Sequence, residues 1–257
     1  MHTRLARVLI AGVSLASAYS ARADITGFGN FSEWTINQGD DGPAPMLVDN
    51  GIRLTYLNDV LQQTRSIWHE TPQTVSAFTA SFTYQALNGA TGSGFGAALV
   101  LQNDPDGIHA LGASPGDECG YDGIEDSVAV TLELGLPSRS GLYTDGLFGG
   151  GSPSISPVDL RAGNPVLVSL QYDGSILGVS ILDTVTLDSF DAAYAVDIPA
   201  LVGSSTALVG FTASTGFGSS ADQYIFNPQF TSIPEPGSLA LLALLGATAS
   251  RRRRAAA

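Results

Sequence analysis

Two stretches of this 257-residue chain gather side-chain oxygens of the kind that bind calcium. Residues 103–107 read Asn-Asp-Pro-Asp-Gly, and residues 117–126 carry five acidic side chains. Calcium takes about six to eight oxygen ligands, and an EF-hand loop supplies them from alternating positions with a glutamate at the twelfth. Neither stretch has that spacing. A solvated acidic surface is the alternative interpretation, and the spacing favours it.

Acid–base chemistry would need a pair of carboxylates, and Glu133 offers only one. Retaining glycoside hydrolases hold two carboxyl groups about 5 Å apart, which alternating positions on one strand can provide. Glu133 is flanked by Leu132 and Leu134, and its predicted strand has no second carboxylate. We therefore expect no enzymatic activity.

Cysteine and histidine add no recognisable nucleophile or metal site. Cys119 is the only cysteine, so no intramolecular disulfide can form, and we expect a small buried residue rather than a reactive thiol. Neither His69 nor His109 has a partner nucleophile that the sequence identifies, as a catalytic base would need. Both are interpreted as structural or exposed.

The charge balance excludes one class of partner. The chain has no lysine, and residues 24–233 contain 23 acidic residues and four arginines, a net charge of −19. Such a surface repels phosphate backbones and anionic lipids. Nucleic-acid binding is excluded, whereas neutral glycans and divalent cations stay compatible partners.

The elements that must position these residues are strands. Runs of β-branched, aromatic and apolar residues separated by Gly- and Asp-rich turns predict strands at residues 76–85, 94–102, 127–134, 165–172, 176–182 and 207–213. Asp173-Gly174 predicts a two-residue hairpin turn, and residues 189–194 are expected to hold a turn of helix at most. Many short strands without long helical periodicity predict a single two-sheet sandwich.

The first 23 residues have the pattern of a secretory signal peptide. Arg4 and Arg7 precede an apolar run at residues 8–18, and Ala21 and Ala23 are the small residues that a signal peptidase reads. We expect cleavage after residue 23, a folded domain at residues 24–232 and export of the protein.

The last 25 residues combine a short motif, an apolar stretch and a basic end. Pro234, Glu235 and Pro236 precede uncharged residues 238–250, and a run of arginines begins at Arg251 and Arg252. As a helix the uncharged stretch spans roughly 20 Å, short of the bilayer core of about 30 Å. An ordinary membrane anchor is the alternative interpretation.

This order resembles the PEP-CTERM sorting signal of Gram-negative bacteria. The resemblance implies that residues 233–257 address the protein to an exosortase-type processing protease. The protein would be attached transiently to the inner membrane, through a short apolar C-terminal helix, and then be extracellular or on the cell surface.

Read in order, the segments between the two ends resemble the legume-lectin-like domain of the concanavalin A type. The segments that carry this resemblance are residues 34–37, 51–55, 66–68, 78–82, 94–105, 110–112, 120–124, 127–130, 209–216 and 222–225. The resemblance implies an all-β jelly-roll sandwich that binds carbohydrate.

The residues that bind sugar and metal in the plant members are only partly kept. Ser93, next to the strand start at Gly94, stands at the position of their sugar-binding aspartate. Thr131 and Glu133 stand where the plant proteins have Glu and Asp ligands, and Pro137 falls near the position of the asparagine. The plant-type pair of metal ions is therefore expected to be lost. No cofactor is required by this interpretation, although calcium stays open, with Glu133 and Asp145 as remaining oxygen donors.

Residues 138–146 resemble the loop of a bacterial branch of the family. There Tyr143 could stack on a sugar ring, with backbone groups of Thr215 and Gly216 as further contacts, and packing within a turn is the alternative role for Tyr143. Tyr121 is expected to pack. Together these features predict a secreted or surface-displayed, non-enzymatic lectin-like module whose partner is an extracellular polysaccharide. The alternative is a structural or adhesive matrix protein that binds no sugar.

Overall fold

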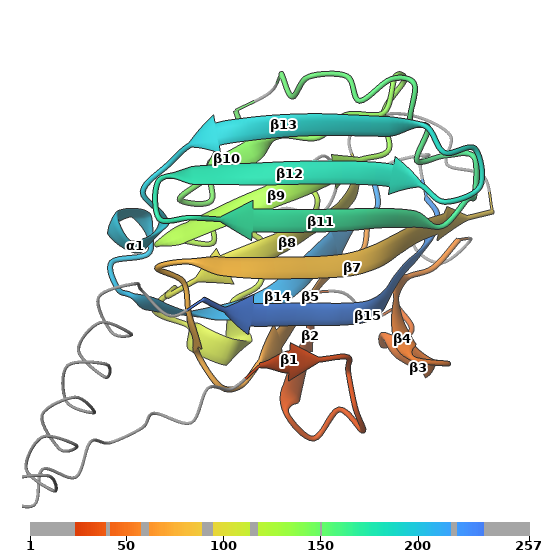
Figure 1. The fold of residues 1–257 in the computed structure, drawn as a ribbon. Coiled ribbons are helices and arrows are strands. Elements are labelled where there is room, and N and C mark those ends of the chain that lie inside the picture. Colours follow the sequence, from red (N-terminus) through yellow and green to blue (C-terminus); the bar gives the residue numbers. More distant parts are fainter. Residues whose placement is uncertain are drawn as a thin grey trace, which may run out of the picture.

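Two antiparallel β-sheets stack face to face in the computed structural model, which describes residues 24–39, 42–57, 62–88, 95–113, 118–149, 151–216 and 220–233. In Figure 1 the eight-stranded sheet lies in front of the seven-stranded one. The all-β jelly-roll sandwich predicted from the sequence is confirmed. No helix in these ranges is long and apolar enough to span a bilayer.

The eight-stranded sheet has the order β13-β12-β11-β7-β15-β4-β3, with β1 paired to β15. Its strands are β1 (Ile25–Thr26), β3 (Met46–Val48), β4 (Gly51–Thr55), β7 (Phe78–Leu87), β11 (Val166–Tyr172), β12 (Ile176–Asp183), β13 (Ser189–Ala195) and β15 (Asp222–Ser232).

The seven-stranded sheet has the order β10-β9-β8-β14-β5-β2, with β6 paired to β14. Its strands are β2 (Trp34–Gln38), β5 (Thr64–His69), β6 (Gln73–Thr74), β8 (Gly96–Gln102), β9 (Ser127–Glu133), β10 (Leu142–Thr144) and β14 (Thr206–Ser214). A 3₁₀-helix, η1 (Gly107–His109), and one turn of α-helix, α1 (Ile198–Leu201), lie in connections.

The main core fills the space between the sheets. Alternate residues of β7 point into it, beginning with Phe78 and including Phe82, because successive side chains of a strand face opposite sides. The ring of Phe82 meets Phe211 of β14 edge-on with centroids 5.0 Å apart, and Phe78 stacks on Phe230 at 4.7 Å. The first contact joins the two sheets, and the second joins neighbouring strands β7 and β15 of one sheet.

A second, smaller core covers the outer face of the seven-stranded sheet. It contains Trp68, Val100 and Ala129 from the strands and Tyr121 from the connection between β8 and β9. Every residue of β5, β8 and β9 is therefore buried. Burial on both faces explains why β8 and much of β9 read as apolar runs rather than as alternating patterns, whereas β5 carries polar residues that are buried as well.

The predicted strands are confirmed to within two residues at each end, but residues 189–194 are not helical. They form β13, whose exposure alternates residue by residue while it pairs with β12 along its length. The α-helical turn lies further on, at α1, where the Asp197 side chain accepts a hydrogen bond from the Ala200 N–H at 3.1 Å.

The hairpin at Asp173-Gly174 is present, but its turn is longer than two residues. Residues 173–175 separate β11 from β12. The Asp173 carboxylate accepts hydrogen bonds from the N–H groups of Ile176 and Ser175, each at 2.9 Å, and these bonds lower its pKa. By accepting hydrogen bonds from the backbone of the turn, the Asp173 carboxylate stabilises a turn of three residues instead of two.

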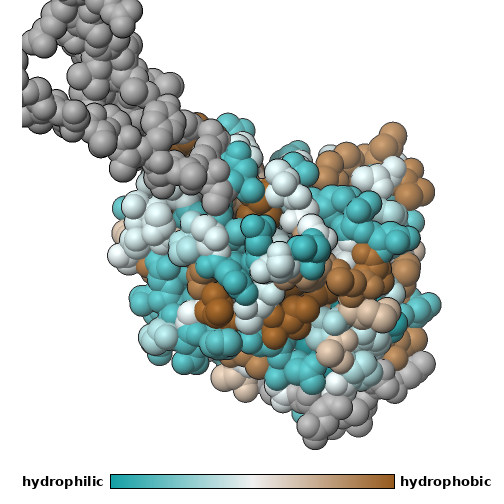
Figure 2. All heavy atoms as spheres, turned by 90° about the horizontal axis from the view of Figure 1, so that it is seen from below, coloured by the Kyte–Doolittle hydropathy of each residue, from teal (hydrophilic) through white to brown (hydrophobic). Residues whose placement is uncertain are grey.

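The surface carries both hydrophilic and hydrophobic residues. On the face seen from below, the hydrophobic ones gather in patches (Figure 2). Exposed large hydrophobic residues include Met46 and Leu47 on the edge strand β3. This strand has three residues, and short edge strands limit unwanted pairing with other chains.

Candidate functional site

One end of the sandwich, here called the loop end, gathers three of its connections. Register places Leu87 beside Asp222, Gln223 beside Thr55, and Ser214 beside both Thr64 and Gly96. Residues 56–63, 88–95 and 215–221 therefore leave the sheets at the same end. Side chains distant in sequence meet there.

The carboxylate of Asp222 ties these connections together. Its Oδ1 accepts hydrogen bonds from the Leu57 N–H at 2.7 Å and from the Arg53 guanidinium, and its Oδ2 accepts one from Asn88 Nδ2 at 2.6 Å. Hydrogen bonds to an ionised group are stronger than neutral ones. One buried carboxylate thus fixes the residues that flank all three connections.

A neutral network lies beside Asp222. Gln63 donates through Nε2 to the Tyr56 carbonyl at 2.7 Å, while its Oε1 accepts from the Tyr56 N–H at 3.0 Å. The Arg53 guanidinium lies 3.8 Å from the centre of the Tyr56 ring. Burial raises the pKa of Tyr56, against the opposing effect of Arg53, so its hydroxyl stays protonated at neutral pH.

Thr215 and Gly216 lie at the loop end and are both buried. The Thr215 N–H donates to the Gln63 carbonyl at 3.0 Å, and its Oγ1 accepts from the Gln63 N–H at 2.9 Å. These groups hold the two connections together. The Thr215 N–H is therefore already used and is not free to donate to a sugar.

Glu133 ends β9 near the same end, and hydroxyl groups surround its carboxylate. Ser152 Oγ and Thr131 Oγ1 donate to Oε1, the latter at 2.9 Å. Because Ser152 gives its only proton to Glu133, the Tyr143 hydroxyl 2.6 Å away donates to Ser152. These hydroxyl groups use Oε1 of the carboxylate that the sequence offered as a metal ligand.

The structure does not bring Glu133 and Asp145 together. The Asp145 N–H donates to the Ser127 carbonyl at the opposite end of β9. Six residues of extended strand separate Ser127 from Glu133, or roughly 20 Å, too far for a shared ion. Within the described ranges no three His, Cys, Asp or Glu side chains form a group that could hold a metal.

Tyr143 is 9% exposed, and one face of its ring is covered. The Phe148 ring stacks on it with centroids 4.4 Å apart and an angle of 15°. Burial raises the pKa of Tyr143 while its hydroxyl is held by Ser152. A sugar could stack on the covered face only after Phe148 moved, so turn packing accounts for the position of Tyr143.

Tyr121 packs in the second core, as the sequence led us to expect. Ser127 Oγ donates to the Ile124 carbonyl, so the Tyr121 hydroxyl donates to Ser127 at 2.7 Å and accepts from the Gly146 N–H at 3.1 Å. Burial raises the pKa of Tyr121 to about 12. It is a structural residue, without exposed surface for a ligand.

Several predicted residues lie outside the described ranges. They are Ser93 and Gly94, the sorting residues Pro234, Glu235, Pro236, Arg251 and Arg252, and the cleavage residues Ala21 and Ala23. Conversely, sequence reasoning missed Asp222, Asn88 and Gln63. Their partners are set by strand register rather than by local spacing, so no short motif marks them.

We predict that Glu133→Gln lowers the free energy of unfolding by about 1–3 kcal/mol, because Ser152 and Thr131 would then donate to a neutral amide oxygen instead of a charged carboxylate oxygen. Urea unfolding followed by circular dichroism would measure the change. Melting temperatures of the wild type should be the same in chelator and in calcium. A rise with calcium that the Glu133→Gln variant lacks, but an Asp145→Asn control keeps, would instead make Glu133 a metal ligand.

We predict that Tyr121→Phe costs about 1–3 kcal/mol at pH 7, because it leaves the buried Gly146 N–H without its acceptor. The folded-state pKa of Tyr121, about 12, lies above the ordinary value of 10.0. The stabilisation is therefore complete below pH 10 and is lost as pH rises through about 12. Chemical unfolding across this range should show it, with Tyr224→Phe, at a half-buried tyrosine, as the near-neutral control.

The chain resembles solved lectin structures along most of its length. Lectin I-B4 of Griffonia simplicifolia, in its metal-free form, superposes with a TM-score of 0.68 at 17% identity and covers 82% of this chain and 100% of its own. Arcelin-5, a lectin-like defence protein of Phaseolus vulgaris, gives 0.67 at 14% identity, with 83% and 99% covered.

Winged bean acidic lectin, complexed with methyl-α-D-galactose, also gives a TM-score of 0.67, at 16% identity, with 83% of this chain and 99% of its own covered. No protein-family model and no curated protein matches the sequence. These likenesses establish the architecture, and the chain has the fold of the legume lectins.

Proposed function

We propose that this protein is a non-enzymatic carbohydrate-binding module, exported from the cell, whose partner is an extracellular polysaccharide. The observation that carries the proposal is the superposition on lectins, which covers 82–83% of this chain and nearly all of theirs. Among the similar structures, the winged bean lectin holds methyl-α-D-galactose and the Bauhinia forficata lectin holds GalNAc.

The loop end supports binding without a metal ion. Plant-type ligands are replaced by Thr131 and Glu133, and hydroxyl groups donate to Oε1 of the Glu133 carboxylate. Asp222 supplies an alternative means of ordering the connections, through protein donors alone. The net charge of −19 between residues 24 and 233 favours a neutral glycan over an anionic one.

We predict that the purified protein binds neutral oligosaccharides on a glycan array equally well in calcium and in chelator. Asp222→Asn should weaken this binding by about tenfold, because the amide cannot accept all three hydrogen bonds and the connections loosen. Asp173→Asn changes a comparable carboxylate at the opposite end and should bind as the wild type does.

Two results would contradict this function. Failure to bind any glycan, together with concentration-dependent self-association in sedimentation, would favour a structural or adhesive matrix protein. Calcium-dependent binding would mean that the acidic loops form a metal site.

Export is a separate part of the proposal. Its support lies in the sequence: the signal-like segment at residues 1–23, read at Ala21 and Ala23, and the sorting-like tail at residues 233–257. Signal peptidase and an exosortase-type protease would be the processing partners, and the mature protein would be extracellular or on the cell surface.

We predict that replacing Pro234, Glu235 and Pro236 with alanine leaves the protein in the inner membrane of its producing cell. The replacement removes the processing motif but keeps the apolar stretch and the arginines at 251–254. Cell fractionation and the mass of the mature chain, compared with the wild type, would measure this. Unchanged release with an unchanged mature mass would contradict the prediction.

A further inference from the structure

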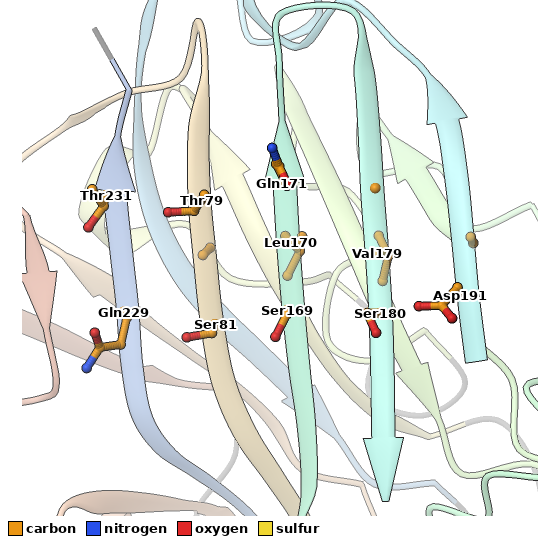
Figure 3. A pocket seen from close by; sticks show the side chains of 13 residues that line it. Thr79, Ser81, Ser169, Leu170, Gln171, Val179, Ser180, Asp191, Gln229 and Thr231 are labelled. Atoms are coloured by element: carbon orange, nitrogen blue, oxygen red, sulfur yellow. The ribbon is translucent and has the colours of Figure 1, made fainter. Parts of the chain in front are cut away.

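A hollow of about 540 Å³ lies on the outer face of the eight-stranded sheet, away from the loop end. Figure 3 shows its lining side chains on β15, β7, β11, β12 and β13. Its volume is within the range of about 300–1,000 Å³ that small-molecule sites occupy. Sequence reasoning did not identify it.

The residues at the floor of the hollow form one row, which strand register aligns across the sheet. The row that crosses the five strands is Asp191, Ser180, Ser169, Ser81 and Gln229, each paired with the next. At a strand spacing of about 4.8 Å it is roughly 19 Å long. Short serines in the middle leave a groove, which we call the serine groove.

The two rows beside the serine groove contain side chains of different lengths. On one side the next row is Thr231, Thr79, Gln171, Gly178 and Ala193, and on the other it is Phe226, Thr83, Leu167, Leu182 and Ser189. The apolar members of the lining that alternate with the serines, Leu170 and Val179 among them, point into the main core and are buried. The floor is therefore polar, and its sides are tall at Gln171, Leu167 and Leu182 but low at Gly178.

The polar side chains of the groove have no hydrogen-bonding or ionic partner among the residues that the structure describes. Eight of them line it: Thr79, Ser81, Ser169, Gln171, Ser180, Asp191, Gln229 and Thr231. None forms a side-chain hydrogen bond or ion pair with another described residue. At the loop end, by contrast, Asp222 uses both carboxylate oxygens internally. The groove thus presents unused donors and acceptors in a hollow.

We propose that the serine groove is a second carbohydrate site, which binds a neutral polysaccharide chain lengthwise across the five strands. Serine and threonine hydroxyls donate and accept hydrogen bonds, as sugar hydroxyls do. The Asp191 carboxylate at one end can accept from neighbouring sugar hydroxyls with charge-assisted strength. The groove lies on an open sheet face, so a chain can pass along it rather than insert only its end.

Other ligand classes fit the lining less well. Asp191 is its only charged residue, so an anionic polymer gains no cation there. The centres of protein–protein interfaces are enriched in aromatic residues, Met and Arg, none of which lines the hollow. A peptide that adds a strand needs a sheet edge, and four of the five strands have hydrogen-bonded neighbours on both sides.

The serine groove and the loop end are separate surfaces. Ser81 lies six residues before Leu87 on β7, or roughly 20 Å along the strand. Two sites on one chain would let the protein hold two glycan segments together, which raises apparent affinity through effective concentration. This inference goes beyond the proposed loop-end function and does not require it.

The test uses two variants of the whole chain that differ only in hydroxyl groups. In one, Ser81, Ser169 and Ser180 are replaced by valine, and in the other by threonine. The two side chains have nearly the same shape and both favour strands. Affinity electrophoresis through gels containing dextran, galactomannan or hydroxyethyl cellulose would measure binding, with alginate as the anionic comparison.

We expect at least one neutral polymer to retard the wild type and the threonine variant. The valine variant should lose affinity by about tenfold or more, because three hydrogen-bonding groups are gone. Alginate should retard none of them. Asp222→Asn should keep its retardation by polymer even where it loses oligosaccharide binding, which separates this site from the loop end.

Three outcomes would overturn the proposal. They are equal retardation of the valine and threonine variants, loss of all polymer binding through Asp222→Asn alone, and no retardation by any neutral polymer. Circular dichroism of both triple variants would confirm that each is folded.

Discussion

The carbonyl oxygen of Ala110 holds the connection between β8 and β9 in place, and the rest of the structure depends on this contact. It accepts hydrogen bonds from Trp68 Nε1 at 2.8 Å and from Ser66 Oγ at 2.7 Å. These two bonds fasten the connection between β8 and β9 to the outer face of the seven-stranded sheet. Strands β5, β8 and β9 are then buried on both sides, and a polar group beneath the connection costs free energy unless it finds a partner inside the protein.

The hydroxyl cluster at Glu133 follows from that constraint. A carboxylate at the end of a doubly buried strand needs donors, and Ser152 and Thr131 provide them. At the loop end Asp222 is satisfied in the same way, by protein groups. The described part of this sandwich therefore uses hydrogen bonds at Glu133, which the sequence offered as a metal ligand, and at Asp222, which the sequence did not single out.

The sequence predicts the architecture well because the two sheets impose strong patterns. Doubly buried strands such as β8 read as apolar runs, and the singly buried β7 alternates. Strand β13 was not predicted because Asp191 and the alanines around it separate its two strand formers, Phe190 and Tyr194, although pairing with β12 settles its conformation. The contacts of Asp222 and the serine row could not be predicted, since each depends on register between strands far apart in sequence.

The placement of arginine determines how readily trypsin-like proteases can cleave the folded protein. Trypsin-like proteases cleave after lysine or arginine, and this chain has no lysine. Of the four arginines between residues 24 and 233, Arg65 is fully buried, and Arg53, Arg139 and Arg161 are only partly exposed. The folded domain thus offers such proteases no fully exposed basic side chain, which suits a protein proposed to persist outside the cell.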